Sequence, residues 1–359
     1  MLGRLFKKTE TGPQPKAQQS LIDPLEGNAT AHAWERRLRE GQWREFGAFL
    51  REQSDIEERD YYLSTLSQAI RGWPAWVDRW VEEQPGDVNA RLFRAWRYKD
   101  YAWEARGGGG ANTVQRGAWD LFFSRLEAAD ADLALAADLA PDDAGPWALM
   151  VTTARGRQLG IPELRRRFAE ADQRSPLHTL ACRNVLQGVA AKWGGSHELM
   201  FELARGMSSR APMGSPIHAL IPTTHLEFWL QEQNNAYWQS PLVRQEIVEA
   251  GRKALSQPIQ TPYLISTRNA FACCYWLLNE PALLAAQIQE INGIITRSPW
   301  HYFGQPSQIY LQAQAPPRSS DKESVTGRQR DSSSAAALAR APVTRRRRRR
   351  TRAPTGRTA

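Results

Sequence analysis

Apolar residues recur at steps of three and four through most of this chain, and this spacing constrains its fold more than any other feature. One clear run contains Phe122, Leu126, Ala129, Leu133, Ala136 and Ala140. The positions between them are polar and include Arg125, Glu127, Asp130, Asp132 and Asp138. A helix with 3.6 residues per turn places such an apolar set on one face. Because no alternating strand pattern and no Asn-Gly hairpin signal competes with it, the sequence predicts an all-α fold.

Composition divides the 359 residues into three zones. Residues 1–28 are polar with scattered Pro and Gly, and we expect a flexible N-terminal arm. Residues 29–312 carry the helical spacing and predict an α-helical repeat domain. Residues 313–359 contain 13 Lys and Arg against 3 Asp and Glu, so they account for the net charge of +9, and the helical part is close to neutral. Low hydrophobicity with high charge cannot offset the entropy of ordering, which predicts a disordered, Arg-rich tail.

Proline residues divide the helical zone at regular intervals. Pro141, Pro176 and Pro212 are separated by 35 and 36 residues, which leaves room for two helices and two turns. A residue before Pro avoids the α conformation, and Pro fits the first turn of the next helix, so prolines with this spacing separate helical hairpins. A period of about 34 residues is the tetratricopeptide signature. The sequence therefore predicts a tetratricopeptide-like solenoid of about a dozen helices, whose first helices line a concave face.

Four consecutive glycines, Gly107 to Gly110, interrupt this pattern. They lie between Pro85 and Pro141, which are 56 residues apart and leave room for an insertion of about 20 residues in one repeat. A phosphate-binding loop or a dinucleotide fingerprint would follow a strand, and a phosphate loop would also place a Lys after its glycines. These glycines follow a helical pattern, and no Lys comes after them. We therefore predict a hinge in which Gly107 ends one helix in the left-handed conformation and Asn112 or Thr113 caps the next.

Two short motifs carry a resemblance to a known family. The first is W-x-A-R-G, at Trp103, Ala105, Arg106 and Gly107. The second is K-W-G-G-S, at Lys192, Trp193, Gly194, Gly195 and Ser196. Together with the helical segments around them, over about residues 87–230, they resemble an uncharacterised family of bacterial helical-repeat domains of unknown function. This resemblance implies a tetratricopeptide-like fold and supplies no catalytic residue.

Neither a metal site nor a catalytic site emerges from the sequence. None of the six His stands in an H-E-x-x-H motif, and no Cys pair has zinc-ligand spacing. Ser196, His197 and Glu198 are adjacent, whereas a catalytic triad combines distant residues, so Ser196 is better interpreted as a helix N-cap. The cysteines are typical of reduced core residues, and they are Cys182, Cys273 and Cys274. We expect no enzyme activity, no metal and no cofactor; an enzyme would require a pocket assembled from distant polar groups.

Polar and mostly positive residues on the predicted first helices are the feature of the helical zone that most suggests a function. They are Arg91, Arg94 and Arg97 on one helix, Arg155 and Arg157 on a second, and Arg183 with Asn184 on a third. On a concave face, such residues would bind partner carboxylates through paired hydrogen bonds. The alternative is an ordinary solvated face, or internal ion pairs with the acids Asp87, Asp100, Glu127 and Asp130. The first interpretation predicts a non-catalytic scaffold that binds a protein or peptide.

The tail offers a second function. Its consecutive arginines are Arg345, Arg346, Arg347, Arg348, Arg349 and Arg350. Three interpretations remain open, namely nucleic-acid binding through phosphates, binding of acidic lipid or protein, and no role at all. A nucleic-acid-associated protein is therefore the alternative function, although no aromatic residue among the arginines supports base stacking. Because no apolar run is long enough to span a membrane and no signal-peptide core precedes the arm, we expect a cytoplasmic protein without stable membrane association.

Overall fold

The computed structural model describes residues 22–107 and 114–314, and the regular structure in those residues is helical apart from one isolated bridge between Ile22 and Ile295. The all-α prediction is confirmed. The α-helices are α1 (Ala29–Arg39), α2 (Trp43–Glu52), α3 (Ile56–Ala69), α4 (Ala75–Glu83), α5 (Val88–Arg106), α6 (Arg116–Leu139), α7 (Gly145–Gly156), α8 (Ile161–Arg174), α9 (Thr179–Gly188), α10 (His197–Arg210), α11 (Leu220–Glu232), α12 (Pro241–Leu255), α13 (Leu264–Leu277), α14 (Pro281–Ile291) and α15 (Pro306–Gln314). Short 3-10 helices lie between them, namely η3 (Ala191–Trp193), η4 (Pro216–Ala219), η5 (Asn235–Gln239) and η6 (Trp300–Phe303).

Side-chain caps fix where several helices begin. Asn28, Asp55, Asp87 and Ser196 each accept a hydrogen bond from a backbone N–H in the first turn, in α1, α3, α5 and α10 respectively. A cap of this kind satisfies a donor that the helix itself leaves unpaired. The prediction that Ser196 is an N-cap is confirmed, because its Oγ accepts from the amide of Leu199 at 3.1 Å.

The glycine run begins as predicted and then differs. Gly107 ends α5 with a φ of +73°, a conformation that favours glycine, but its ψ of 179° lies outside the left-handed helical region that we expected. The cap of the next helix is also different, because α6 begins at Arg116 and its N-cap is Gln115. The expected caps and the rest of the run lie outside the described residues, namely Asn112, Thr113 and Gly108 to Gly110.

The helices between the predicted breaks come in pairs. Three helices, α6, α8 and α10, each end two residues before a predicted break, and these breaks are Pro141, Pro176 and Pro212. The first interval holds α7 and α8, and the second holds α9 and α10. The longer interval before Pro141 holds two α-helices as well. Its extra length is taken up by α5, with 19 residues, by α6, with 24, and by the loop between them.

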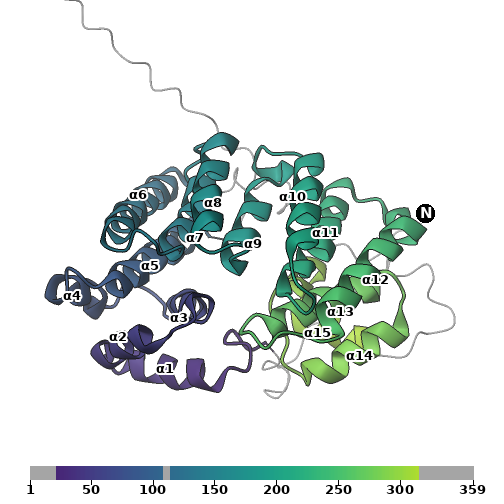
Figure 1. Ribbon diagram of the computed structural model, residues 1–359, viewed down its shortest axis with the longest axis horizontal. Coiled ribbons are helices and arrows are strands. Elements are labelled where there is room, and N and C mark those ends of the chain that lie inside the picture. Colours follow the sequence, from purple (N-terminus) through teal and green to yellow (C-terminus); the bar gives the residue numbers. More distant parts are fainter. Residues whose placement is uncertain (1–21, 108–113, 315–359) are drawn as a thin grey trace, which may run out of the picture.

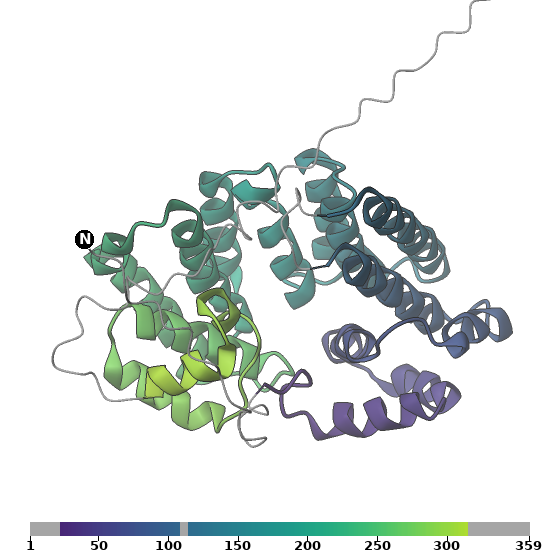
Figure 2. The ribbon, with the colours of Figure 1, turned by 180° about the vertical axis from the view of Figure 1, so that it is seen from behind.

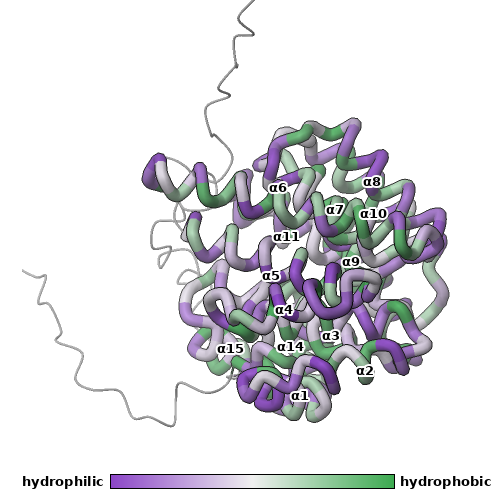
Figure 3. Tube along the Cα trace, turned by 90° about the vertical axis from the view of Figure 1, so that its left-hand side faces the viewer, coloured by the Kyte–Doolittle hydropathy of each residue, from purple (hydrophilic) through white to green (hydrophobic). Residues whose placement is uncertain are grey.

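The helices follow one another round an arc (Figures 1 and 2). The two helices of each pair pack against each other, and α6 also packs against α7 of the next pair. The first helices of successive pairs contact one another too, so α5, α7, α9, α11 and α13 form a continuous row. Apolar and polar residues alternate along the helices (Figure 3), which is the pattern expected of helices with one buried face.

The two ends of this arc meet. The segment before α1 lies beside the loop after α14, where the amide of Asp23 donates to the carbonyl of Ile295 at 3.3 Å. The hydroxyl of Tyr61, on α3, donates to the carbonyl of Leu25 at 3.0 Å. The Tyr61 ring also packs edge-on against Tyr263, just before α13, with ring centres 5.7 Å apart. Residues before the expected boundary at residue 29 are therefore packed into the fold.

Inside the arc, α3 lies against α9. Glu57 accepts a hydrogen bond from the amide of Thr179 at 2.6 Å, and the Nε2 atom of His178 lies 3.2 Å from a carboxylate oxygen of Asp60. These contacts join residues more than a hundred positions apart in the chain. The inner side of α9 is therefore occupied by α3.

Two large groups of buried apolar side chains form the core, one from residues 25–150 together with Tyr263 and one from residues 151–313. Tryptophan contributes strongly, since Trp43, Trp80 and Trp300 are all fully buried. Such rings supply the largest apolar area of any side chain. The cysteines are free and buried, and burial raises the pKa of their thiols, which are those of Cys182, Cys273 and Cys274. They are therefore unreactive core residues, as predicted.

Candidate functional site

Arg91 and Arg94 face inward, against α6. Nε and Nη2 of Arg94 donate to the two carboxylate oxygens of Asp132, each at 2.7 Å, and Arg91 lies 3.5 Å from the same carboxylate. Asp132 is buried at this contact. Paired hydrogen bonds of this geometry are among the strongest that a guanidinium makes. The two arginines therefore hold α5 against α6. Their shared partner, Asp132, is not among the acids that the sequence analysis named as internal partners.

Arg97 is entirely buried, with 0% of its side chain exposed. Its guanidinium donates to the carbonyls of Ser67, Ile70 and Gly72 at 2.6 to 2.8 Å. These carbonyls lie at the C-terminal end of α3, where a helix leaves its last acceptors unpaired. Arg97 therefore caps α3 from a neighbouring helix and has no surface to offer a partner while the fold is intact.

Arg157 also makes internal contacts. It forms an ion pair with Asp130 on α6 and lies 3.7 Å from Glu127, two of the acids that the sequence suggested. Asp130 accepts a further hydrogen bond from Arg167 on α8 at 3.0 Å. This network lies in a shallow groove of about 450 Å³ formed by α6, α7 and α8. Four of the charged residues that line the groove therefore already have partners, namely Asp130, Arg157, Arg166 and Arg167.

The two predicted residues on α9 connect this helix to α13 and to α7. Nη2 of Arg183 donates to the hydroxyl of Ser266 at 3.1 Å, and its guanidinium lies 5.0 Å from the ring centre of Tyr263. The amide of Asn184 donates to the carbonyl of Ala148, on α7, at 3.0 Å. Both side chains thus hold the row of first helices together.

Arg155 differs from these six residues. It lies in the last turn of α7, and its guanidinium carbon is 6.0 Å from the ring centre of Trp103 and 5.3 Å from that of Trp193. Within residues 22–107 and 114–314 its guanidinium has neither a hydrogen bond nor an ion pair, and its Nε is buried without a partner. Burial lowers the pKa of Arg155 to about 10, although Glu227 and Tyr302 favour its charged form.

Burying the charge of Arg155 costs free energy, and contacts within the fold offset only part of that cost. The negative end of the α7 helix dipole stabilises a cation in the last turn by about 0.3–1 kcal/mol. Each nearby aromatic face adds about 0.5–2 kcal/mol. Desolvation of an ion costs several kcal/mol. A half-buried guanidinium without an acidic partner is therefore a group that an incoming anion would stabilise.

The two motifs that carried the family resemblance meet at this arginine. Trp103 lies near the end of α5 and Trp193 in η3, and their rings are edge to face with centres 6.1 Å apart. Gly194 follows in the left-handed conformation, with φ +90°. A Cβ atom on Gly195 would stand 1.8 Å from the carbonyl oxygen of Val189, so only glycine fits there. The glycine pair thus turns the chain tightly enough to hold Trp193 beside Trp103.

Arg106 belongs to the same cluster. Its guanidinium lies 5.4 Å from the ring centre of Trp103 and 5.3 Å from that of Trp119, on α6. The residue is buried, which lowers its pKa, and its Nη1 donates to the carbonyl of Gly107 at 3.2 Å. The W-x-A-R-G motif therefore contributes both an aromatic ring and a cation to the cluster.

Sequence reasoning missed Glu227, which lies beside the cluster on α11. Its Oε2 accepts from Nζ of Lys192 at 2.6 Å, and its Oε1 accepts from Gln187 at 2.8 Å and from the hydroxyl of Tyr302 at 3.1 Å. Burial acts to raise the pKa of Glu227, but Lys192 and these hydrogen bonds lower it overall. The available signal was an acid within the apolar stretch LEFWL of α11, which indicates a buried and paired carboxylate.

We call the set of Trp103, Arg106, Arg155, Lys192, Trp193 and Glu227 the Arg155 cluster. It combines a cation that has no hydrogen bond or ion pair within the described residues, half-buried aromatic rings and a neutralised Lys–Glu pair. Ser196, three residues after Trp193, already accepts from a backbone amide as an N-cap.

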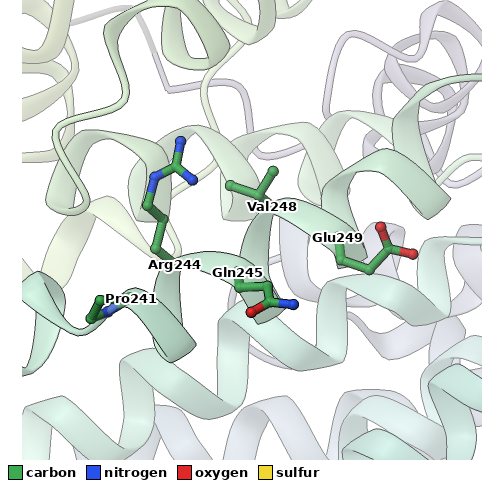
Figure 4. Close-up of a pocket in the computed structure, with 5 residues that line it drawn as sticks. All are labelled: Pro241, Arg244, Gln245, Val248 and Glu249. Carbon is green, nitrogen blue, oxygen red and sulfur yellow. The ribbon is translucent and has the colours of Figure 1, made fainter.

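The other features of the described residues give less support for a functional site. A second shallow depression is lined by five side chains that all belong to α12, namely Pro241, Arg244, Gln245, Val248 and Glu249 (Figure 4). Across residues 22–107 and 114–314, no three His, Cys, Asp or Glu side chains are grouped so that they could hold a metal ion. In the same part of the chain, no helix is both long and apolar enough to cross a membrane. The six tail arginines, Arg345 to Arg350, lie outside the described residues.

Comparison with known proteins gives no match: no protein-family model, no curated protein and no solved structure is significantly similar to this chain.

Proposed function

We propose that this chain is a non-catalytic, tetratricopeptide-like helical-repeat scaffold that binds a partner protein or peptide. The pairing of α7 with α8 and of α9 with α10, at a spacing of 35 and 36 residues, supports a repeat of helical hairpins. The continuous row of first helices supports it as well. Helical repeats stacked in this way present an extended surface to a partner.

The strongest support for the proposal is the environment of Arg155. Of the seven polar residues that the sequence suggested for partner binding, Arg155 is the one that has no hydrogen bond or ion pair within the described ranges. Arginine and tryptophan are the residue types that most often dominate the binding free energy of an interface. Here one Arg and two Trp meet on half-buried surface. The other six residues are engaged in hydrogen bonds or ion pairs within the fold.

The proposed contact surface lies at one edge of the arc. Trp103 and Arg155 stand in the last turns of α5 and α7, and Trp193 follows the end of α9. The C-terminal ends of three successive first helices therefore meet at this edge. On the inner side of the arc, by contrast, α3 already covers part of α9. A partner that docks at the Arg155 cluster does not have to displace α3.

The test is affinity capture from an extract of the source cells with the full chain as bait. We expect Arg155→Gln to weaken retention of the captured partner by about tenfold or more, because hot-spot residues contribute at least about 2 kcal/mol. Arg157→Gln, two residues away and ion-paired to Asp130, is the matched control and should retain the partner. Equal retention by wild type and Arg155→Gln would contradict the proposal.

A fourth bait, lacking residues 315–359, separates this proposal from the alternative of a nucleic-acid-associated protein. The scaffold proposal expects the shortened chain to retain the same partner. The alternative expects retention to disappear with the tail and to be removed from the full chain by nuclease or by high salt, because phosphate contacts are strongly salt-dependent.

A further inference from the structure

We infer that the group bound at the Arg155 cluster is a single carboxylate attached to an apolar or aromatic moiety. This inference rests on the proposed function and specifies the chemistry of the ligand at the same site. In it, Arg155 holds the carboxylate, Trp103 and Trp193 contact the apolar part, and Glu227 limits the charge that the site accepts.

The guanidinium of Arg155 has unused hydrogen-bonding capacity. Its Nε is buried and unpartnered, and no nitrogen of its guanidinium forms an ion pair in the described part of the chain. Its two Nη groups are neither hydrogen-bonded within the described residues nor fully buried, and together they match the two oxygens of a carboxylate. Glu227 cannot supply those oxygens, because both of its own already accept from Lys192, Gln187 and Tyr302.

The charges around Arg155 bear on which anion fits there. Lys192 and Glu227 form an ion pair at 2.6 Å and cancel each other. Arg106, the other cation of the cluster, already donates to the carbonyl of Gly107, so Arg155 is the cation of the cluster that has no hydrogen bond within the described residues. A carboxylate carries one negative charge and matches the single charge of Arg155. A phosphate monoester carries up to two near neutral pH, and its second charge would face Glu227. The nearness of Glu227 to Arg155 therefore favours a carboxylate over a phosphate.

The surface beside Arg155 is aromatic. The guanidinium carbon lies 5.3 and 6.0 Å from two tryptophan rings that meet edge to face, so a group held by Arg155 also faces indole surface. Both tryptophans are only partly buried. Aromatic faces of this kind favour an apolar or planar neighbour. The recognised chemistry is thus the carboxylate of an acidic side chain or of a chain terminus, next to an apolar residue.

The experiment is a titration of the full chain, at constant ionic strength, followed by NMR of the arginine Nε–H groups. The Arg155 signal is identified by its absence in Arg155→Lys. We expect sodium benzoate to shift this signal saturably. Benzamide, which has the same shape without the charge, should leave it in place. Inorganic phosphate should bind about tenfold more weakly than benzoate, because of the repulsion from Glu227.

Two peptide probes distinguish the sources of the carboxylate. One ends in Phe with a free carboxyl group, and the other carries an internal Asp beside Phe and has an amidated end. Binding of the first alone assigns the site to a chain terminus, and binding of the second alone assigns it to an acidic side chain. Binding of neither, at concentrations that saturate with benzoate, would overturn the inference for peptides.

Variants that change the charges around Arg155 should either strengthen or weaken benzoate binding. Glu227→Gln removes a negative charge and should tighten benzoate binding by about fivefold, whereas Lys192→Gln should weaken it by a similar factor. Arg155→Gln should abolish the saturable binding measured by calorimetry, and Arg157→Gln should leave it unchanged. A purely structural role for this cluster predicts no variant with tighter binding, so a gain in Glu227→Gln is the discriminating result.

Two outcomes would overturn the inference. One is a chain that remains folded, by circular dichroism, and whose Arg155 signal does not move with benzoate. The other is binding that persists in Arg155→Gln. Failure of the inference is distinguishable from failure of the proposed function. Partner capture that depends on Arg155, without benzoate binding, removes only the carboxylate inference, whereas benzoate binding without a captured partner removes only the scaffold proposal.

Discussion

Replacing Arg97 with Met is expected to lower the free energy of unfolding by about 3–5 kcal/mol, the range seen when one member of a buried charged network is removed. Arg97 is fully buried and donates to the carbonyls of Ser67, Ile70 and Gly72. Methionine fills a similar volume but donates nothing, so these acceptors at the end of α3 lose their partner. Urea unfolding followed by far-ultraviolet circular dichroism measures the loss.

The matched control is Arg44→Met. Arg44 is ion-paired to Glu83, but both side chains are largely exposed, at 56% and 40%. An exposed pair contributes about 0–1 kcal/mol, so this variant should unfold close to wild type. Equal stability losses in the two variants would show that Arg97 acts as an ordinary surface charge and not as a cap of α3.

A second large effect is expected at Glu26, where the ends of the arc meet. Burial raises the pKa of Glu26 from the usual 4.5 to about 7, although Arg183 favours its charged form and Asp23 opposes it. One of its oxygens, Oε2, is buried without a hydrogen-bond partner. A carboxyl with a higher pKa in the folded state stabilises the fold below about pH 4.5, and this stabilisation is lost as the pH rises through about 7.

Replacing Glu26 with Gln removes this dependence. The stability of Glu26→Gln relative to wild type should therefore increase by on the order of 2 kcal/mol between about pH 4 and pH 8. Denaturant unfolding at both pH values measures the difference. The control is Glu52→Gln, at an exposed position of α2, and it should show no such increase. A constant difference across this pH range would contradict the closure of the arc around Glu26.

Most of the helical framework follows from short-range signals in the sequence. The three-and-four spacing located the helices, the prolines located the ends of α6, α8 and α10, and Ser196 was identified as a cap from its neighbours alone. These signals act over one or two turns, so a sequence displays them directly. The closure of the arc was not predictable in this way, because it depends on contacts such as that between Tyr61 and Tyr263, 202 positions apart.

The candidate site also combines features that the sequence displays with contacts that only the fold creates. The sequence picked out Arg155, Trp103 and Trp193 separately, but their convergence depends on how three hairpins stack. The Arg91, Arg94 and Arg97 stripe looked available to a partner, because Asp132 was assigned to the polar face of α6. In the structure Asp132 lies against α5 and is buried, paired with Arg91 and Arg94. The resemblance to a family of helical-repeat domains stays a prediction.

The most direct test of the central claim is site-specific photo-crosslinking of the captured partner. A photoreactive phenylalanine analogue is placed at Trp193 in one protein and at Arg244, on the exposed face of α12, in another. If the Arg155 cluster is the contact surface, the partner crosslinks from position 193 and not from position 244. Crosslinking from position 244 alone, or equally from both, would contradict the account.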